Sequence, residues 1–129
     1  MNLSVAQAAM DATGFVYVPA SCNATVTACH VHVHYHPCGG NWQETSLGYM
    51  LGSGKAAYAE SNRLILLYPQ ASVAGPWGGD CWDWAGAATG AEFDTKDSVQ
   101  LSAVMAMLSD LENLVREGKP MPSEWPPPS

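Results

Sequence analysis

The sequence contains little charge, and basic residues are especially scarce. Only 13% of its 129 residues are charged, against about 25% in typical soluble domains. Five Lys and Arg stand against twelve Asp and Glu, which gives a formal net charge of −7. Proteins that bind nucleic acids need a basic surface to neutralise phosphates, so this class is excluded. Disorder is also excluded, because it requires low hydrophobicity and 47% of the residues are apolar.

The sequence also lacks long apolar runs. None approaches the roughly 20 residues of a membrane-spanning helix, so we expect no membrane segment. Residues 1–10 contain no Lys or Arg and no long apolar core, and they do not form a secretory signal. Because the cysteines and Asn23, which begins an Asn-Ala-Thr glycosylation triplet, nevertheless favour secretion, we expect the chain to be one piece of a longer secreted protein.

Four cysteines in so short a chain indicate two disulfide bonds formed in an oxidising compartment. Three pairings are open at this point for the four residues, which are Cys22, Cys29, Cys38 and Cys81.

The order of the secondary-structure signals predicts one α/β domain over residues 1–119, followed by a Pro-rich tail over 120–129. Short β-rich runs predict three strands, over 14–19, 30–36 and 63–69. Periodic apolar residues predict two helices, over 44–62 and over 97–117, the second beginning with a capping box at Asp97 and Gln100. The segment between them, 70–95, is rich in Gly and Trp and has no regular period.

The strand–helix–strand segment 30–68 is a βαβ unit, which predicts a mainly parallel sheet. Ligands of open α/β sheets bind beyond the carboxyl ends of the strands, here at 37–42 and 70–84. Each of these segments carries one cysteine, so we pair Cys38 with Cys81, and Cys22 with Cys29. Helices on one face only would leave apolar strand surface bare, so we expect a complementing segment, self-association or poor solubility.

A row of alternating histidines is the most conspicuous local pattern: His30, His32, His34 and His36. Two imidazoles on one face of a strand can begin a zinc site if a third ligand joins them. The further ligands would have to come from loops, at Glu44, Asp80 or Asp83. The alternative is that polar residues simply line the polar face of a strand, and we expect no metal and no cofactor.

A serine nucleophile cannot be identified. The nearest approach to a G-x-S-x-G elbow is Gly52-Ser53-Gly54, which has the wrong spacing and lies in a predicted helix. A second candidate feature is the segment 79–84, in which Trp82 and Trp84 flank Asp83 next to Cys81. These rings can form a rigid apolar wall for a ligand, or a small local core that packs a long loop.

Five sequence blocks resemble the extracellular polyhydroxybutyrate (PHB) depolymerase family. The residues are Gly14-Phe15-Val16-Tyr17-Val18-Pro19 with Cys22; residues 29–38, where the family reads like C-R-L-H-V-A-L-H-G-C; residues 58–70, similar to Y-A-(E/D)-T-N-N-I-I-V-L-Y-P-Q; Cys81-Trp82-Asp83-Trp84; and Asp94-Thr95-Lys96-Asp97. The resemblance implies a partial α/β-hydrolase-like sandwich of about three mainly parallel strands with two helices. It also implies hydrolysis of hydrophobic polyesters or short-chain esters by a Ser-Asp-His triad, without a cofactor.

The resemblance implies roles for a few residues of this chain. The backbone N–H of Cys38 matches a donor of the oxyanion hole, and Trp82 or Trp84 matches an aromatic wall of the substrate crevice. In the circularly permuted fungal-like branch the triad lies upstream of these blocks, so this chain would be a carboxyl-terminal portion with little or no esterase activity by itself. His32 and His36 belong to the family pattern, which weakens the metal hypothesis.

The chain also departs from the family pattern at the proposed site. Pro37 replaces a glycine and stiffens the turn beside Cys38. Residues 85–87 replace W-G-Y and remove two aromatic rings. Two alternatives to the hydrolase hypothesis therefore stay open: a non-catalytic polyester-binding remnant, and a metal-binding module that uses the histidine row.

Overall fold

The structure, a computed structural model, describes residues 8–23, 29–76 and 79–117. Its elements are β1 (Phe15–Tyr17), α1 (Ala20–Asn23), β2 (His30–Val33), α2 (Trp42–Thr45), α3 (Gly48–Gly52), α4 (Lys55–Asn62), β3 (Leu64–Tyr68) and α5 (Val99–Glu117). The expected Pro-rich tail and the Asn23 side chain lie outside the described residues. None of the helices described is both long and apolar enough to cross a bilayer.

The three strands form one sheet in the order β1-β3-β2. The predicted βαβ unit is confirmed, because β2 pairs with β3 in parallel, with His30 opposite Leu64. β1 pairs with β3 in the antiparallel sense, with Phe15 opposite Tyr68, so the sheet is mixed rather than mainly parallel. Because β2 is parallel to β3, β1 also runs opposite to β2. The chain therefore reverses direction between Tyr17 and His30, as an antiparallel strand requires.

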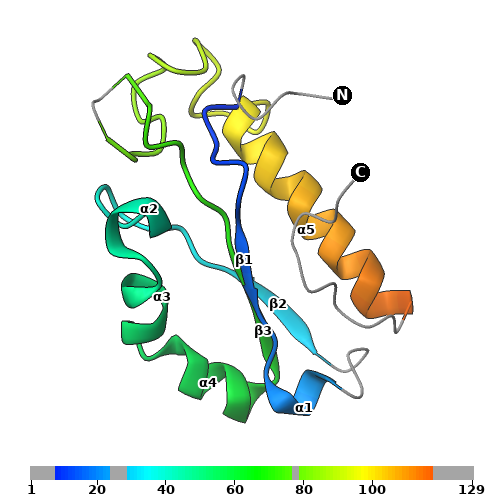
Figure 1. Cartoon of the computed structure of the whole chain (residues 1–129). Coiled ribbons are helices and arrows are strands. Elements are labelled where there is room, and N and C mark those ends of the chain that lie inside the picture. The colour runs from blue at the N-terminus through cyan, green and yellow to red at the C-terminus, as the bar shows by residue number, and fades with distance from the viewer. Residues whose placement is uncertain (1–7, 24–28, 77–78, 118–129) are drawn as a thin grey trace.

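Helices cover both faces of the sheet, so the expectation of a one-sided arrangement is wrong (Figure 1). On one face, Ile65 and Leu67 of β3 pack with Leu111 of α5. On the other face, Leu66 of β3 packs with Met50 of α3. Successive strand residues point to opposite faces, so the unbroken apolar run of β3 requires cover on both.

The predicted helix over 44–62 is replaced by three short helices, α2, α3 and α4. Two residues with left-handed φ values interrupt the segment: Ser46 at 54° and Gly54 at 76°. α2 begins at its cap Asn41, whose side chain accepts a hydrogen bond from the backbone N–H of Gln43 at 2.7 Å. Gly48, Gly52 and Gly54 weaken the helix signal in the sequence. The positions of the breaks, however, depend on how the short helices pack against the sheet, which the local sequence does not reveal.

α5 is close to its predicted extent, although its predicted capping box does not form. The helix begins at Val99, and the Ser98 hydroxyl, rather than Asp97, accepts from the backbone N–H of Leu101 at 3.4 Å. Gln100 is buried and points its side chain away from the cap, donating to the carbonyl of Ala9 at 3.2 Å. The element was predicted correctly because its apolar stripe is a purely local signal.

Replacing Leu111 tests the packing of α5 on the sheet. Leu111 is fully buried, so Leu111→Ala should lower the free energy of unfolding by about 2–5 kcal/mol in urea denaturation. Met105 lies on the same helix and is 52% exposed, so Met105→Ala should change it by less than about 0.5 kcal/mol. Equal destabilisation of both variants would contradict this placement of the helix.

Candidate functional site

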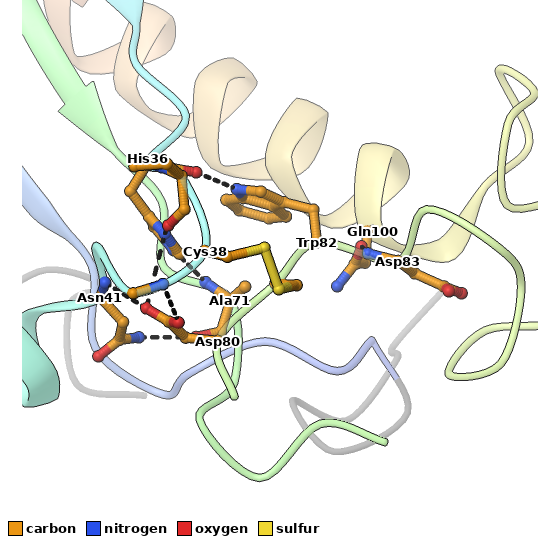
Figure 2. The surroundings of a disulfide bond; sticks show 11 residues. His36, Cys38, Asn41, Ala71, Asp80, Trp82, Asp83 and Gln100 are labelled. Carbon is orange, nitrogen blue, oxygen red and sulfur yellow. Dashed lines mark hydrogen bonds and ion pairs between the residues drawn. A yellow bond between two sulfur atoms is a disulfide. The ribbon is translucent and has the colours of Figure 1, made fainter. Parts of the chain in front are cut away.

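Two segments that follow the carboxyl ends of the parallel strands are joined covalently. Cys38 follows β2 and Cys81 follows β3, and their sulfur atoms are 2.03 Å apart. Cys22 and Cys29 form the second disulfide, with a sulfur–sulfur distance of 2.08 Å. Both predicted pairings are therefore confirmed. The first bond brings the end of the histidine-rich segment against the Trp-bearing loop, as Figure 2 shows.

The segment after β2 forms a tight turn around the carboxylate of Asp80. Gly40 N–H donates to the Pro37 carbonyl at 2.9 Å, which closes a four-residue turn over 37–40. Gly39 has φ of 79°, as the third position of a type II turn requires. The backbone N–H groups of Gly39 and Asn41 donate to the two oxygens of Asp80, each at 2.5 Å. Cys38 lies at the second position of this turn.

Asp80 is buried and held in its charged form. Burial raises the pKa of its carboxyl group, but the hydrogen bonds from the backbone N–H groups of Asn41 and Gly39 outweigh this effect and hold the pKa below its usual value. Asp80, a candidate metal ligand in the sequence analysis, therefore accepts hydrogen bonds from the backbone of the turn.

His36 connects the ends of β2 and β3. Its Nε2 accepts from the backbone N–H of Ala71 at 3.0 Å, so this nitrogen carries no proton. Its Nδ1 donates to the Pro37 carbonyl at 2.8 Å. The ring is buried, and its neutral tautomer is fixed by these two backbone contacts. His36 is thus a structural residue of the turn.

The four histidines do not come together as a metal site. His34 bonds through Nε2 to the Tyr49 hydroxyl at 3.2 Å; burial lowers its pKa, and the charge of Lys55 lowers it further. His32 lines a separate pocket with Ser53 and Lys55. Within the described parts of the chain, no three His, Cys, Asp or Glu side chains are grouped so that they could hold a metal ion. The metal-binding alternative therefore gains no support from the structure.

Ser53 lies in the turn between α3 and α4, not in a strand-to-helix elbow. Its hydroxyl donates to the Met50 carbonyl at 3.0 Å. It shares a pocket of about 360 Å³ with His32 on the α4 face of the sheet, not with Cys38. This geometry gives Ser53 no role beside the Cys38 turn.

The two tryptophans of the segment 79–84 have different surroundings. Trp82 donates its indole N–H to the His36 carbonyl at 3.0 Å (Figure 2). The centre of its ring lies 5.2 Å from that of His36 and 5.1 Å from that of Tyr35. Trp82 therefore matches the second of the two predicted roles, a small local core that packs the loop. Trp84 is 66% exposed and fits the apolar wall. Their substrate-binding roles stay predictions.

Four residues that line a pocket in this region were not singled out from the sequence: Tyr35, Phe93, Ser98 and Leu101. A pocket of about 330 Å³ lies beside Trp82, lined by Tyr35, Trp82, Asp83, Phe93, Ser98, Gln100 and Leu101. Asp83 orders the loop that borders it, accepting from Gly86 N–H at 2.9 Å, Thr89 N–H at 2.8 Å and the Thr89 hydroxyl at 2.6 Å. Burial raises the pKa of Asp83, but the hydrogen bonds from Thr89 and from the backbone of Ala88 and Gly86 together hold the pKa below its usual value. The segment 70–95 has no period, so only its apolar and acidic composition hinted at this arrangement.

Comparison with known proteins identifies the relatives. No protein-family model matches the sequence. Over 113 residues the chain is 32% identical to a polyhydroxybutyrate depolymerase of Talaromyces funiculosus, covering 79% of this chain and 33% of that protein. Over 100 residues it is 37% identical to a poly(3-hydroxybutyrate) depolymerase of Delftia acidovorans, covering 77% of this chain and 20% of that protein.

Two solved structures that resemble this chain are also PHB depolymerases. One is a PHB depolymerase from Penicillium funiculosum, 33% identical with a TM-score of 0.65. The other is a serine-to-alanine PHB depolymerase variant complexed with an R3HB trimer, 32% identical with the same TM-score. Each match covers 76% of this chain and 34% of the other chain. The chain is related to the PHB depolymerases.

The resemblance expected from the five sequence blocks is thus confirmed. The fold is a partial α/β arrangement, with a mixed three-stranded sheet, that corresponds to about a third of the matched depolymerase structures.

The two disulfides should differ in how much they stabilise this depolymerase-like chain. Cys38–Cys81 spans 43 residues, whereas Cys22–Cys29 spans 7. Loop-closure entropy predicts a destabilisation of about 4 kcal/mol for the double variant Cys38→Ser with Cys81→Ser, and about 2 kcal/mol for Cys22→Ser with Cys29→Ser. Guanidinium denaturation of the two variants measures these differences. A larger destabilisation from opening the short loop would contradict the prediction.

Proposed function

We propose that this chain provides the oxyanion donor and the substrate wall of a PHB depolymerase-like carboxylic ester hydrolase. Its substrate would be a hydrophobic polyester or a short-chain ester. The nucleophile and its base would lie upstream, in residues of the complete enzyme outside the region matched here, so that this chain would be its carboxyl-terminal portion. Support comes from the identity of 32–37% to PHB depolymerases, of which this chain spans only a fifth to a third.

The proposal depends on the hydrogen bonding of the Cys38 backbone N–H. The next three N–H groups of the turn are engaged: Gly39 and Asn41 donate to Asp80, and Gly40 donates to Pro37. Cys38 is exposed, and its N–H donates to no acceptor among residues 8–23, 29–76 and 79–117. An N–H fixed in a rigid turn and left without a protein acceptor is suited to receive a negatively charged oxygen.

This donor would act at the step in which negative charge develops. A serine hydroxyl of the complete enzyme would give its proton to the base as its oxygen adds to the ester carbonyl. The carbonyl π electrons would move to the carbonyl oxygen, and the resulting oxyanion would accept a hydrogen bond from the Cys38 N–H. When the oxyanion collapses, the ester C–O bond breaks and the leaving alkoxide takes the proton back from the base. Water, deprotonated by the same base, would then add to the acyl-serine ester through a second oxyanion and release the acid and the serine. Loss of one such donor typically costs about 100- to 1000-fold in kcat.

The aromatic residues near the turn support an apolar substrate. Trp84 and Tyr35 are exposed, and Tyr35 packs edge-on against Trp82 beside the pocket of about 330 Å³. Large aromatic rings contribute apolar area at a small entropic cost. The two disulfides support an extracellular location, where such a polymer would be met.

We further propose that a complementing depolymerase segment contacts this chain beside β1. An apolar groove of about 130 Å³ lies there, lined by Phe15, Val16, Tyr17, Leu47, Met50, Leu51, Ala56 and Tyr68. Leu47 is 42% exposed and Leu51 is 66% exposed. The chain covers only a fifth to a third of the matched relatives, and a segment from the remainder of such a protein would cover this groove.

Adsorption to a PHB film tests the substrate wall. Removing about 100 Å² of indole contact corresponds to about 2.5 kcal/mol, so Trp84→Ala should weaken adsorption about 10- to 100-fold, measured by depletion from solution. Tyr58 is the control, because it is 71% exposed but lies on α4, at the opposite end of the structure from the 79–95 segment (Figure 1). Tyr58→Ala should adsorb like the wild type. If both variants lose adsorption equally, the wall is not at Trp84.

A further inference from the structure

We propose that Asp80 is the residue that positions the oxyanion donor, because its carboxylate fixes the turn that holds the Cys38 N–H. This inference rests on the proposed function, since it assigns a purpose to the turn. It goes beyond that function by naming a residue that touches neither substrate nor the reacting atoms.

Each oxygen of the Asp80 carboxylate accepts a hydrogen bond from a different backbone N–H group. Oδ1 accepts from Gly39, directly after Cys38, and Oδ2 accepts from Asn41, two residues further on (Figure 2). The disulfide to Cys81 restrains the Cys38 sulfur but not the orientation of its peptide groups. The carboxylate therefore restrains the backbone on the carboxyl side of Cys38, whereas the Pro37 ring restrains it on the amino side.

Backbone N–H groups, rather than a basic side chain, balance the charge of Asp80. The group that lies within ion-pair distance of it in the described part of the chain is His36, whose Nδ1 is 3.9 Å from Oδ2, but the proton on this nitrogen is directed to the Pro37 carbonyl. The lowered pKa of Asp80 agrees with this arrangement, in which the charged form is the hydrogen-bonded one. The charged carboxylate of Asp80 thus orders the turn 37–40 through both of its oxygens.

An asparagine at this position could not do the same work. Its side chain offers one acceptor oxygen, and its NH₂ group would face the second backbone N–H, so two donors would meet. Only one of the two hydrogen bonds would then remain, and the turn would be held mainly by the disulfide and by the Gly40–Pro37 hydrogen bond. We therefore expect Cys38 N–H to adopt several orientations in such a variant.

Amide hydrogen exchange on the oxidised wild-type chain gives the first test, by NMR with uniform ¹⁵N labelling. Hydrogen bonds to a charged acceptor should make the amides of Gly39 and Asn41 exchange about 10- to 100-fold more slowly than the amide of Cys38. Equal exchange at these three amides would overturn the proposal. This measurement needs no variant, so the hydrogen bonds on which the proposal depends can be refuted even if a substitution prevents folding.

The second test compares Asp80→Asn with Asp83→Asn. Asp83 is a matched control, because it is also a buried carboxylate that accepts backbone N–H groups, but those of the 86–89 loop. In Asp80→Asn, exchange at Gly39 and Asn41 should rise about 10- to 100-fold, and the residual dipolar coupling of the Cys38 N–H should fall toward zero. In Asp83→Asn all three amides should keep their wild-type values.

These outcomes separate the proposal from the function on which it rests. If the Cys38 coupling in Asp80→Asn stays at its wild-type value, Asp80 does not position the donor, whatever reaction the chain serves. If Asp80 holds the turn as described but the chain supports no ester hydrolysis in a complete enzyme, the proposed function fails and the measured dependence of Cys38 on Asp80 remains.

Discussion

The structure depends on holding two irregular segments together beyond the carboxyl ends of β2 and β3. The Cys38–Cys81 disulfide joins them covalently, and the adjacent Asp80 carboxylate engages the turn that contains Cys38. His36 adds a third connection through the Ala71 N–H. Neither segment has a regular ladder of its own, so these contacts decide where the Cys38 N–H and the tryptophans lie. The proposed site exists only as long as they persist.

The sequence predicted the parts of the fold whose signals are local. The unbroken apolar run of β3 and the stripe of α5 identify their elements without knowledge of the rest of the chain. The βαβ order then placed Cys38 near Cys81, and this pairing is confirmed. The breaks at Ser46 and Gly54 escaped prediction because they depend on how α2–α4 return to the sheet. The antiparallel direction of β1 escaped prediction because the small polar residues between Tyr17 and His30 carry no pattern that fixes the direction of the next strand.

The sequence predicted which segments form the candidate site, but not the contacts that its side chains make. Trp82 and Trp84 were recognised together, yet one packs on His36 and the other is exposed. Asp80 was weighed as a metal ligand, but its oxygens accept backbone N–H groups. Which of these roles a carboxylate takes depends on the path of the 70–95 segment, and a segment without a period does not reveal its path. Basic residues are scarce in this chain, and the two buried carboxylates are stabilised by hydrogen bonds instead: Asp80 by backbone N–H groups, and Asp83 by the Thr89 hydroxyl and backbone N–H groups.

The most direct measurement is the esterase activity of a chimera. In it, the matched region of the Talaromyces funiculosus PHB depolymerase is replaced by the corresponding region of this chain. The account predicts that the chimera hydrolyses p-nitrophenyl butyrate, that Ser53→Ala leaves this activity unchanged, and that the present chain alone has little or none. A folded chimera with both disulfides formed and no hydrolysis would contradict the account, as would activity of the isolated chain that disappears in Ser53→Ala.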